Sequence, residues 1–288
     1  MLSICVPTFN REKELNYFLG TIGVYSDVQV VICDDGSTDN TRSIVRSYKN
    51  KLNIDYIYQE NSGRSVALKN AILSATGKYT VLMDSDDYFM PNAIDVIFEG
   101  IKLIESDIVP SDVKSLLFGT KLIRGERSDL NIPPDLITNF IEIRADYKVK
   151  HDLKEVVLTE LLKECIYTVP AGCRRVPTSL LWCRIAKLSR CLSVSKLIAV
   201  KEYLPGGMTD QNLYLKTKYS EPMVILYALL AESSAYKSVL YRLRCRLMWA
   251  RYSWHWGNNK TTRFWQKLYL IPGSVIYIFD RYKLSKLE

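Results

Sequence analysis

The sequence lacks the cysteine spacings and the long apolar runs that mark several classes of protein. Its seven cysteines are an odd number without any C-x-x-C pair, so neither a disulfide framework nor a zinc site is expected, and a reducing cytosol fits them best. No stretch reaches the ~18 uncharged apolar residues of a membrane-spanning helix, and the first residues lack the basic and apolar segments of a signal peptide. We therefore expect a cytoplasmic protein that does not span a bilayer.

What the sequence does contain is enough apolar material for a packed core. Of its 288 residues 48% are hydrophobic, which suits one large domain or two modest ones. The formal charge of +8 is uneven, because residues 236–288 carry 11 Lys and Arg against two acids, while the first 235 positions are close to neutral. The same basic segment holds four of the five tryptophans. Positive charge and tryptophan are therefore concentrated near the C-terminus.

Short apolar runs alternate with amphipathic segments over the first 105 residues. This alternation predicts right-handed β–α–β units, a parallel sheet and an α/β fold of the nucleotide-binding type. Strands are predicted at 2–6, 28–33, 54–58 and 79–83, and helices at 11–22, 37–48, 66–75 and 91–104. Beyond this half we expect helices at 153–162 and 178–188, a strand at 198–203 and a mostly helical region over 210–288.

Polar clusters follow each of the four predicted strands at the point where the strand ends. They are residues 7–10, 34–37, 59–64 and 84–87. Because ligands of parallel α/β sheets bind beyond the carboxyl ends of the strands, the four clusters predict one binding site at that edge.

The last of these clusters packs three carboxylates, Asp84, Asp86 and Asp87, into four residues. Oxygen ligands of this kind suit Mg²⁺ or Mn²⁺. Such an ion would bridge the phosphates of a nucleotide diphosphate and neutralise the charge that develops on this leaving group. The alternative is a solvated acidic turn before the helix that Pro91 begins.

Asp34, Asp35 and Arg64 also leave two interpretations open. Either carboxylate could accept a hydrogen bond from a base or from a ribose hydroxyl, or the segment could be an Asx turn that caps the next helix. Arg64 could reach a phosphate, or it could be an ordinary solvated charge.

The chain resembles the family 2 glycosyltransferases of the GT-A fold in four ordered segments. These are Val6-Pro7-Thr8-Phe9-Asn10, Cys33-Asp34-Asp35-Gly36-Ser37-Thr38-Asp39, Asn61-Ser62-Gly63-Arg64 and Met83-Asp84-Ser85-Asp86-Asp87. The resemblance covers about the first 105 residues and implies a GT-A fold with a mainly parallel sheet. It implies that Asp86 holds the metal, Mn²⁺ or Mg²⁺, with Asp84 near the ribose and the metal, and that Pro7, Thr8, Asp34 and Asp35 line the nucleoside pocket. The candidate nucleotide-sugar site comprises Pro7, Thr8, Phe9, Asn10, Asp34, Asp35, Arg64, Asp84, Ser85 and Asp86.

Two later segments are similar to the middle regions of bacterial polysaccharide-assembly members of the family. They are residues 174–182 and 203–209. Arg174 and Arg175 could clamp phosphate or be surface charge, and Gly206-Gly207 could be a hinge for a closing loop, with Thr209 as a donor, or a plain turn.

The general base that an inverting transfer needs has no clear candidate. Many relatives place it in a Glu-Asp pair in the middle region, and no such pair stands between Cys173 and Trp182. His151 is conceivable, although a lone histidine is more often structural. The carboxylates among which the sequence does not choose are Asp112, Glu142, Asp146, Asp152, Glu160 and Glu164.

The basic and aromatic segment 236–288 is open to three interpretations. It could lie in a membrane interface, bind single-stranded nucleic acid, or be a helical packing element with solvated charges. We expect membrane contact, with no nucleic acid as partner. The predicted organisation is a nucleotide-sugar-binding half over 1–105, an acceptor-binding half over 106–210 and a helical region over 211–288.

Together these features predict an enzyme that works at the inner face of the cell membrane without spanning it. It would transfer a hexosyl or N-acetylhexosaminyl group from a nucleotide diphosphate, expected to be UDP, with inversion. The acceptor would be a growing, polyprenyl-diphosphate-linked saccharide of a bacterial surface polysaccharide such as O-antigen or capsule. The alternatives are a polyprenyl-phosphate sugar synthase, which needs no general base, and a non-catalytic scaffold that binds nucleotide sugars.

Overall fold

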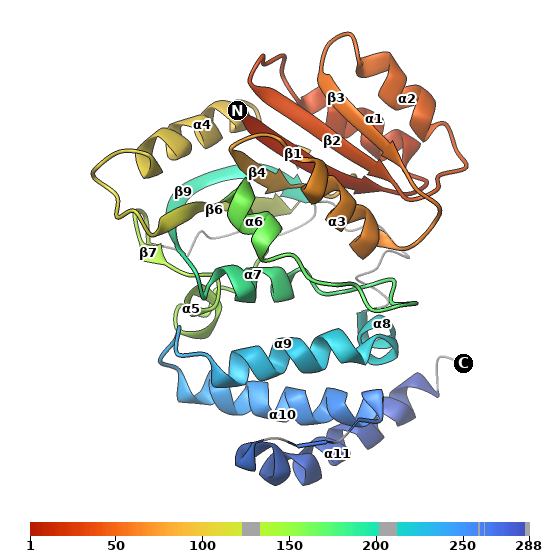
Figure 1. Ribbon diagram of the computed structural model, residues 1–288, viewed down its shortest axis with the longest axis vertical. Coiled ribbons are helices and arrows are strands. Elements are labelled where there is room, and N and C mark those ends of the chain that lie inside the picture. Colours follow the sequence, from red (N-terminus) through yellow and green to blue (C-terminus); the bar gives the residue numbers. More distant parts are fainter. Residues whose placement is uncertain (123–132, 202–211, 259, 262, 286–288) are drawn as a thin grey trace.

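A nine-stranded mixed sheet lies at the centre of the described structure, with helices on both of its faces (Figure 1). The computed structural model describes residues 1–122, 133–201, 212–258, 260–261 and 263–285. Eight strands follow one another in the order β3-β2-β1-β4-β8-β6-β9-β5, and β7 pairs with β9.

The N-terminal part of the sheet is parallel, which confirms the predicted alternation of strands and helices. Strands β1 and β2 are buried along their whole length because helices cover both faces, and this explains their continuous apolar runs. Helices α1, α2 and α4 cover one face and α3 covers the other. The elements of this part are β1 Leu2–Thr8, α1 Glu12–Thr21, β2 Val28–Asp34, α2 Thr41–Tyr48, β3 Asn53–Tyr58, α3 Arg64–Ser74, β4 Tyr79–Leu82, β5 Tyr88–Phe89 and α4 Ala93–Ile104.

The middle of the chain completes the sheet with antiparallel and parallel pairings. Strand β8 runs antiparallel to β4 and β6, while β6 and β9 are parallel to each other. The predicted helix at 178–188 is present as α7. Residues 198–201 of the strand predicted at 198–203 are part of β9, and 202–203 lie outside the described residues. The elements are β6 Val113–Leu122, β7 Ile137–Thr138, α5 Glu142–Ala145, β8 Leu153–Leu158, α6 Thr159–Glu164, α7 Ser179–Ile185 and β9 Arg190–Lys201.

The helix predicted over 153–162 is wrong in its first half. Residues 153–158 form strand β8, and only Thr159–Glu164 are helical. Leu153, Val156 and Val157 have the spacing of a helical face, but two neighbouring strands offer their hydrogen-bonding groups to this segment. Pairing on both sides therefore overrides the local pattern.

Four helices form a layer beneath the sheet, which confirms the predicted helical C-terminal region (Figure 1). Helix α9 packs against α7, α10 packs against α9, and α11 packs against α10. Cys245 and Trp249 of α10 belong to the same core cluster as one face of the sheet, so this part of the basic segment packs on the body. The helices are α8 Asn212–Lys218, α9 Ser220–Glu232, α10 Val239–Trp256 and α11 Phe264–Leu284.

The tryptophans and arginines of this region mostly join helices to one another. Arg251 donates two hydrogen bonds to Asp280, at 2.6 and 2.7 Å, and the Trp254 ring N–H donates to the Leu270 carbonyl at 2.9 Å. Across the described ranges, no helix combines the length and the apolar composition that crossing a bilayer requires.

Gly273 allows α10 and α11 to approach closely. A Cβ atom added at Gly273 would lie 2.4 Å from the Ala250 Cβ and 2.9 Å from the Ala250 carbonyl carbon. Gly273→Ala is therefore expected to lower the free energy of unfolding by about 1–3 kcal/mol through overpacking, measured by urea denaturation. Ser274→Ala, next to it, should change stability by less than about 0.5 kcal/mol. Stabilisation by Gly273→Ala, as helix propensity alone would give, would contradict the close contact.

Candidate active site

The carboxyl ends of the four parallel strands meet at one edge of the sheet, as the sequence predicts. The register pairs Thr8 with Asp34, Asp34 with Tyr58, and Cys5 with Leu82 in neighbouring strands. The segments after these strands therefore lie side by side. The candidate residues placed at this edge are Pro7, Thr8, Phe9, Asn10, Asp34, Asp35, Arg64, Asp84, Ser85 and Asp86.

The first two strand ends are joined by short polar contacts. Asn10 has a left-handed backbone with φ 49°, and its side-chain oxygen accepts the Thr38 N–H at 2.8 Å. Phe9 is exposed, whereas Pro7 and Thr8 are buried in β1. The Thr8 Oγ1 has no hydrogen-bond partner within the described ranges although it is buried. It is a polar atom available to a ligand at this edge.

Asp34 takes the structural role that the sequence left open. It is buried and accepts the Ser37 N–H at 2.8 Å, which is an Asx turn, and the Tyr56 hydroxyl at 2.5 Å. These two bonds satisfy its charge within the protein.

Asp35 holds the loop after β3 in place. Its carboxylate accepts the Gln59 side-chain amide at 2.7 Å and the backbone N–H groups of Ser62 and Gly63 at 2.7 and 2.9 Å. The loop that leads to Arg64 is therefore fixed by a carboxylate of the neighbouring strand end.

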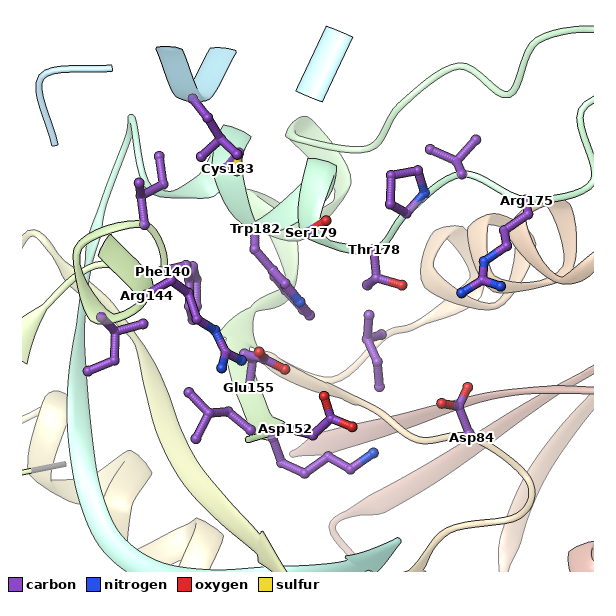
Figure 2. Close-up of a pocket in the computed structure, with 18 of the residues that line it drawn as sticks. Asp84, Phe140, Arg144, Asp152, Glu155, Arg175, Thr178, Ser179, Trp182 and Cys183 are labelled. Atoms are coloured by element: carbon purple, nitrogen blue, oxygen red, sulfur yellow. The ribbon is translucent and has the colours of Figure 1, made fainter. Parts of the chain in front are cut away.

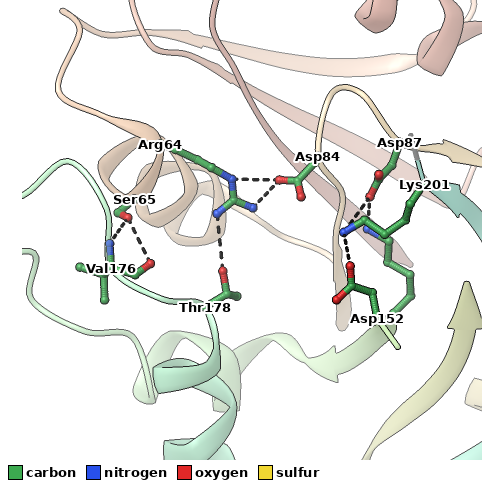
Figure 3. A network of polar contacts seen from close by, with 9 residues as sticks. Arg64, Ser65, Asp84, Asp87, Asp152, Val176, Thr178 and Lys201 are labelled. Atoms are coloured by element: carbon green, nitrogen blue, oxygen red, sulfur yellow. Dashed lines mark hydrogen bonds and ion pairs between the residues drawn. The ribbon is translucent and has the colours of Figure 1, made fainter. Parts of the chain in front are cut away.

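Gly63 lets the middle region approach this loop. Its φ is +97°, and an added Cβ would lie 2.6 Å from the carbonyl oxygen of Arg174. Nearby, the Val176 N–H donates to the Ser65 hydroxyl at 2.6 Å, and the Arg174 guanidinium bonds the Asn61 side chain. The segment that contains Val176 is thus docked on the start of α3 at Ser65 (Figure 3).

Arg64 binds Asp84 across the site (Figure 3). The guanidinium donates twice to the Asp84 Oδ1, once from Nε at 2.9 Å, and lies 3.5 Å from the Thr178 hydroxyl. Burial would raise the pKa of Asp84, but Arg64, and beyond it Lys201 and Lys154, outweigh burial and hold this pKa well below its usual range. Asp84 is therefore ionised, and its Oδ2 has no described partner.

Asp86 and Asp87, two neighbouring carboxylates, have different surroundings. Asp87 is buried and pairs with the Lys154 ammonium at 2.6 Å, with Lys201 at 3.9 Å. Asp86 makes no ion pair with any described residue, and burial together with the charges of Asp84 and Asp87 raises its pKa to about 6. Asp86 is thus the carboxylate of this cluster whose charge the described residues leave uncompensated.

The donor set suits a divalent cation that is shared with a ligand. Within the described ranges, no three His, Cys, Asp or Glu side chains converge on a common metal position. Mg²⁺ characteristically binds one or two carboxylates and completes its shell with phosphates and water. Asp86 with the Oδ2 of Asp84 provides such an incomplete set.

A cavity of about 540 Å³ extends from Asp84 towards the helical layer (Figure 2). Its walls combine the carboxyl edge of the parallel strands, the segment at the start of α7 and the C-terminal helices. The side chains that line it include Arg64, Asp84, Phe140, Arg144, Asp152, Lys154, Glu155, Arg175, Thr178, Trp182, Lys201, Leu230 and Tyr241. The sequence did not lead us to predict Lys154, Glu155 and Lys201 as site residues. The signal available for the first two is that they form a Lys-Glu pair inside an otherwise apolar run.

The carboxylates that the sequence offers as general base differ in whether they line the cavity and in what they bind. Asp152 lines the cavity and pairs with Lys201 at 3.0 Å. Asp112 pairs with Arg190, Glu142 accepts the Thr138 hydroxyl, and Asp146 accepts backbone N–H groups before α10. The remaining candidates, Glu160, Glu164 and His151, do not line the cavity, and Gly206, Gly207 and Thr209 lie outside the described residues.

Residues 3–116 match the family model for Glycosyl transferase family 2. The segment from β1 to β6 thus carries the sequence pattern of the family 2 glycosyltransferases. The match spans β1 to β6 and confirms the resemblance that the strand-end segments carry.

Two curated relatives match parts of the chain. Over 96 residues it is 41% identical to the poly(ribitol-phosphate) beta-N-acetylglucosaminyltransferase TarS of Staphylococcus aureus (strain Mu50), across 30% of this chain and 16% of that protein. Over 160 residues it is 31% identical to the minor teichoic acid biosynthesis protein GgaA of Bacillus subtilis (strain 168), across 52% of this chain and 35% of that protein. The chain spans between 16% and 38% of the length of the curated relatives it matches.

Solved structures share the fold over almost the whole chain. TarS 1–349 of S. aureus in complex with UDP-GlcNAc superposes with a TM-score of 0.66 at 20% identity, across 97% of this chain and 81% of that one. The mannosyltransferase PcManGT of Pyrobaculum calidifontis in complex with GDP-Man and Mn²⁺ gives 0.57 at 16% identity, across 98% and 82%. The fold is the predicted GT-A fold.

The buried ion pair of Asp87 and Lys154 beneath the candidate site predicts a large stability effect. Lys154→Met leaves Asp87 buried with only the more distant Lys201, so the free energy of unfolding should fall by about 3–5 kcal/mol in chemical denaturation. Lys78→Met, which breaks the exposed pair with Glu105, should cost at most about 1 kcal/mol. Equal effects of the two variants would show that the Asp87 pair does not stabilise the fold.

Proposed function

We propose that the chain transfers a sugar from a UDP-sugar to a growing saccharide or polymer of a bacterial cell surface, with inversion at the anomeric carbon. The observation that carries this proposal is the convergence of Asp84 and Arg64 on a cavity at the carboxyl edge of a family 2 glycosyltransferase sheet, with Asp86 in the same turn as Asp84. The likeness to TarS, a transferase of N-acetylglucosamine with a UDP-GlcNAc complex, supports UDP as the nucleotide. TarS and GgaA, named for poly(ribitol-phosphate) and teichoic acid, support a surface polymer as product.

In this proposal the strand ends bind the nucleotide and the cavity binds the acceptor. Pro7, Thr8, Asp34 and Asp35 form the nucleoside side, and the Thr8 hydroxyl, which has no partner among the described residues, is one contact. Asp86 and the free oxygen of Asp84 would hold Mn²⁺ or Mg²⁺. When bound, this ion would neutralise charge on the departing diphosphate.

The chain's own residues prepare the displacement. Arg64 keeps Asp84 ionised and in place, and the loop fixed by Asp35 keeps Arg64 in place. Trp182 and Phe140, with ring centroids 5.3 Å apart, give the cavity an aromatic wall on which a sugar ring can pack.

Asp86→Asn provides the direct test of the metal site. Since the amide removes the uncompensated charge, stabilisation of the protein by UDP and Mn²⁺ together is expected to fall to the level of UDP alone. A thermal-shift titration measures this, because a ligand that binds the native state raises the melting temperature.

Asp107→Asn, an exposed carboxylate outside the site, is the matched control and should respond as the wild type does. Full Mn²⁺-dependent stabilisation in Asp86→Asn would refute the assignment of Asp86. A wild-type protein that UDP and UDP-sugars fail to stabilise, with or without Mn²⁺, would refute the proposed function.

We further propose that α11 attaches the protein to an anionic lipid surface. One side of this helix exposes large apolar side chains with helical spacing: Phe264, Leu268, Ile271, Val275, Ile278, Phe279 and Tyr282. Lys267, Arg281 and Lys283 are exposed on the same helix. Apolar side chains flanked by Lys and Arg suit the boundary between headgroups and acyl chains of anionic lipid.

Ile271→Glu with Ile278→Glu is expected to reduce binding to lipid at least tenfold, because each change places a carboxylate where an apolar side chain would be buried. Cosedimentation with phosphatidylcholine vesicles that contain about one-third phosphatidylglycerol measures it. Ile108→Glu, at an exposed apolar position of the body, is the control. The proposal would be contradicted if the double variant sedimented with the vesicles as the wild type does. It would also be contradicted if the wild type did not bind the vesicles and the double variant instead lost a dimer that the wild type forms.

A further inference from the structure

Glu155 occupies a position of strand β8 where an apolar residue is expected. Leu153, Glu155 and Val157 alternate onto the sheet face that packs against α6, α7 and the C-terminal helices, and Leu153 and Val157 belong to its core. A carboxylate between two core residues of a central strand is unusual unless it is paired or functional.

The adjacent Lys154 shows how this strand accommodates a charge for structural purposes. Lys154 also lines the cavity, but its ammonium group is neutralised by Asp87 at 2.6 Å. No hydrogen bond or ion pair joins the Glu155 carboxylate to another described residue, although the charges of Arg144 and Lys154 act on it. The nearby Arg144 donates its hydrogen bonds to the carbonyl groups of Val149 and His151, at 3.0 and 2.6 Å. Glu155 therefore carries a desolvation cost that no such partner offsets.

The cavity connects this carboxylate with the donor side of the site. Glu155 lines the same cavity as Asp84 and Arg64, together with Asp152 and Trp182 (Figure 2). A volume of about 540 Å³ is within the usual range for small-ligand sites and accommodates a sugar unit. An acceptor in this cavity would lie between Glu155 and the sugar of a donor whose diphosphate is bound at Asp84 and Asp86.

We propose that Glu155 is the general base of the transfer, and that the cavity binds the acceptor sugar whose hydroxyl it deprotonates. This role rests on the proposed sugar transfer. The acceptor O–H gives its proton to the Glu155 carboxylate while the acceptor oxygen forms a bond to the anomeric carbon. The bond between that carbon and the diphosphate oxygen breaks, and its electron pair leaves with the UDP.

Asp152, the other unassigned carboxylate of the cavity, is less suited to this role. The Lys201 ammonium lies 3.0 Å from its carboxylate and stabilises the ionised form, which weakens it as a base. Burial raises the pKa of Glu155 to about 7, against the opposing charges of Arg144 and Lys154 and with a contribution from Asp152. Burial, and after it the charge of Glu155, raises the pKa of the Cys191 thiol of β9. A base of this strength is suited to proton transfer near neutral pH.

The test measures release of UDP from a panel of UDP-sugars with Mn²⁺, with and without octyl glycosides as acceptors. Glu155→Gln is expected to lower the rate at least 100-fold, since general-base catalysis contributes about 10²–10⁴. Stabilisation by UDP should stay unchanged, because Glu155 does not contact the donor side. Glu160→Gln makes the same change at an exposed position of α6 and should keep the wild-type rate.

The pH profile separates a base from a residue that only shapes the cavity. In the wild type, kcat/KM should rise tenfold per pH unit up to a pH near 7 as Glu155 loses its proton. Glu155→Gln should lose this limb, and Glu155→Asp, whose shorter side chain keeps a carboxylate, should keep it at a lower rate. The Asp variant also keeps the test decisive if the Gln variant fails to fold.

Three results would overturn the assignment. A Glu155→Gln rate within about threefold of the wild type would exclude Glu155 as the base. Loss of the acid limb in Asp152→Asn, with retention in Glu155→Gln, would assign the role to Asp152. A wild-type protein that binds UDP and releases it from none of the sugars would refute the proposed transfer and the base with it.

Discussion

The ion pair between Asp87 and Lys154 joins the two parts of the sheet at the point where the site is built. Asp87 stands in the turn after β4, the last of the parallel strands, and Lys154 stands on β8, which runs antiparallel to it. Both side chains are almost completely buried, so neither charge is tolerated without the other. Lys201 of β9 adds a third element through Asp87 and Asp152. The turn that carries Asp84 and Asp86 is therefore held by strands from the middle of the chain.

Fixing this turn has consequences for the other strand ends. Asp84 is held by Arg64, Arg64 begins α3, and the loop before α3 is held by Asp35 at the end of β2. The carboxylates of Asp34 and Asp35 thus act first within the protein, where they order the edge that receives a ligand. Asp86 differs from them because its charge has no partner among the described residues. A site with ordered walls and one uncompensated carboxylate is preorganised for a cation.

The sequence predicted the strands and helices of the first 105 residues well because its signals there are local. Each strand, the turn that ends it and the helix that follows lie within about 25 residues of one another, and their polar ends follow from topology. The prediction of a helix over the residues of β8 was wrong because the contacts that decide this segment are distant in the sequence. Leu153, Val156 and Val157 match a helical face, and the partner that allows Lys154 inside the sheet lies 67 residues away along the chain. The same wrong prediction hid Glu155, because a charged side chain is ordinary on the solvent face of an amphipathic helix and indicates no site there.

The helical layer links the cavity to the proposed lipid surface and so restricts the acceptor. Leu230 of α9 and Tyr241 of α10 line the cavity, whereas α11 packs on α10 on the side away from the sheet (Figure 1). Packed helices are spaced by about 8–10 Å, so lipid in contact with the exposed side of α11 lies at least one helix spacing beyond Tyr241 of α10. An acceptor group held at headgroup level would have to cross this separation to reach Glu155. A saccharide of several units extended from the lipid spans such a distance, and this geometry favours a growing chain over a polyprenyl phosphate as the acceptor of the proposed transfer.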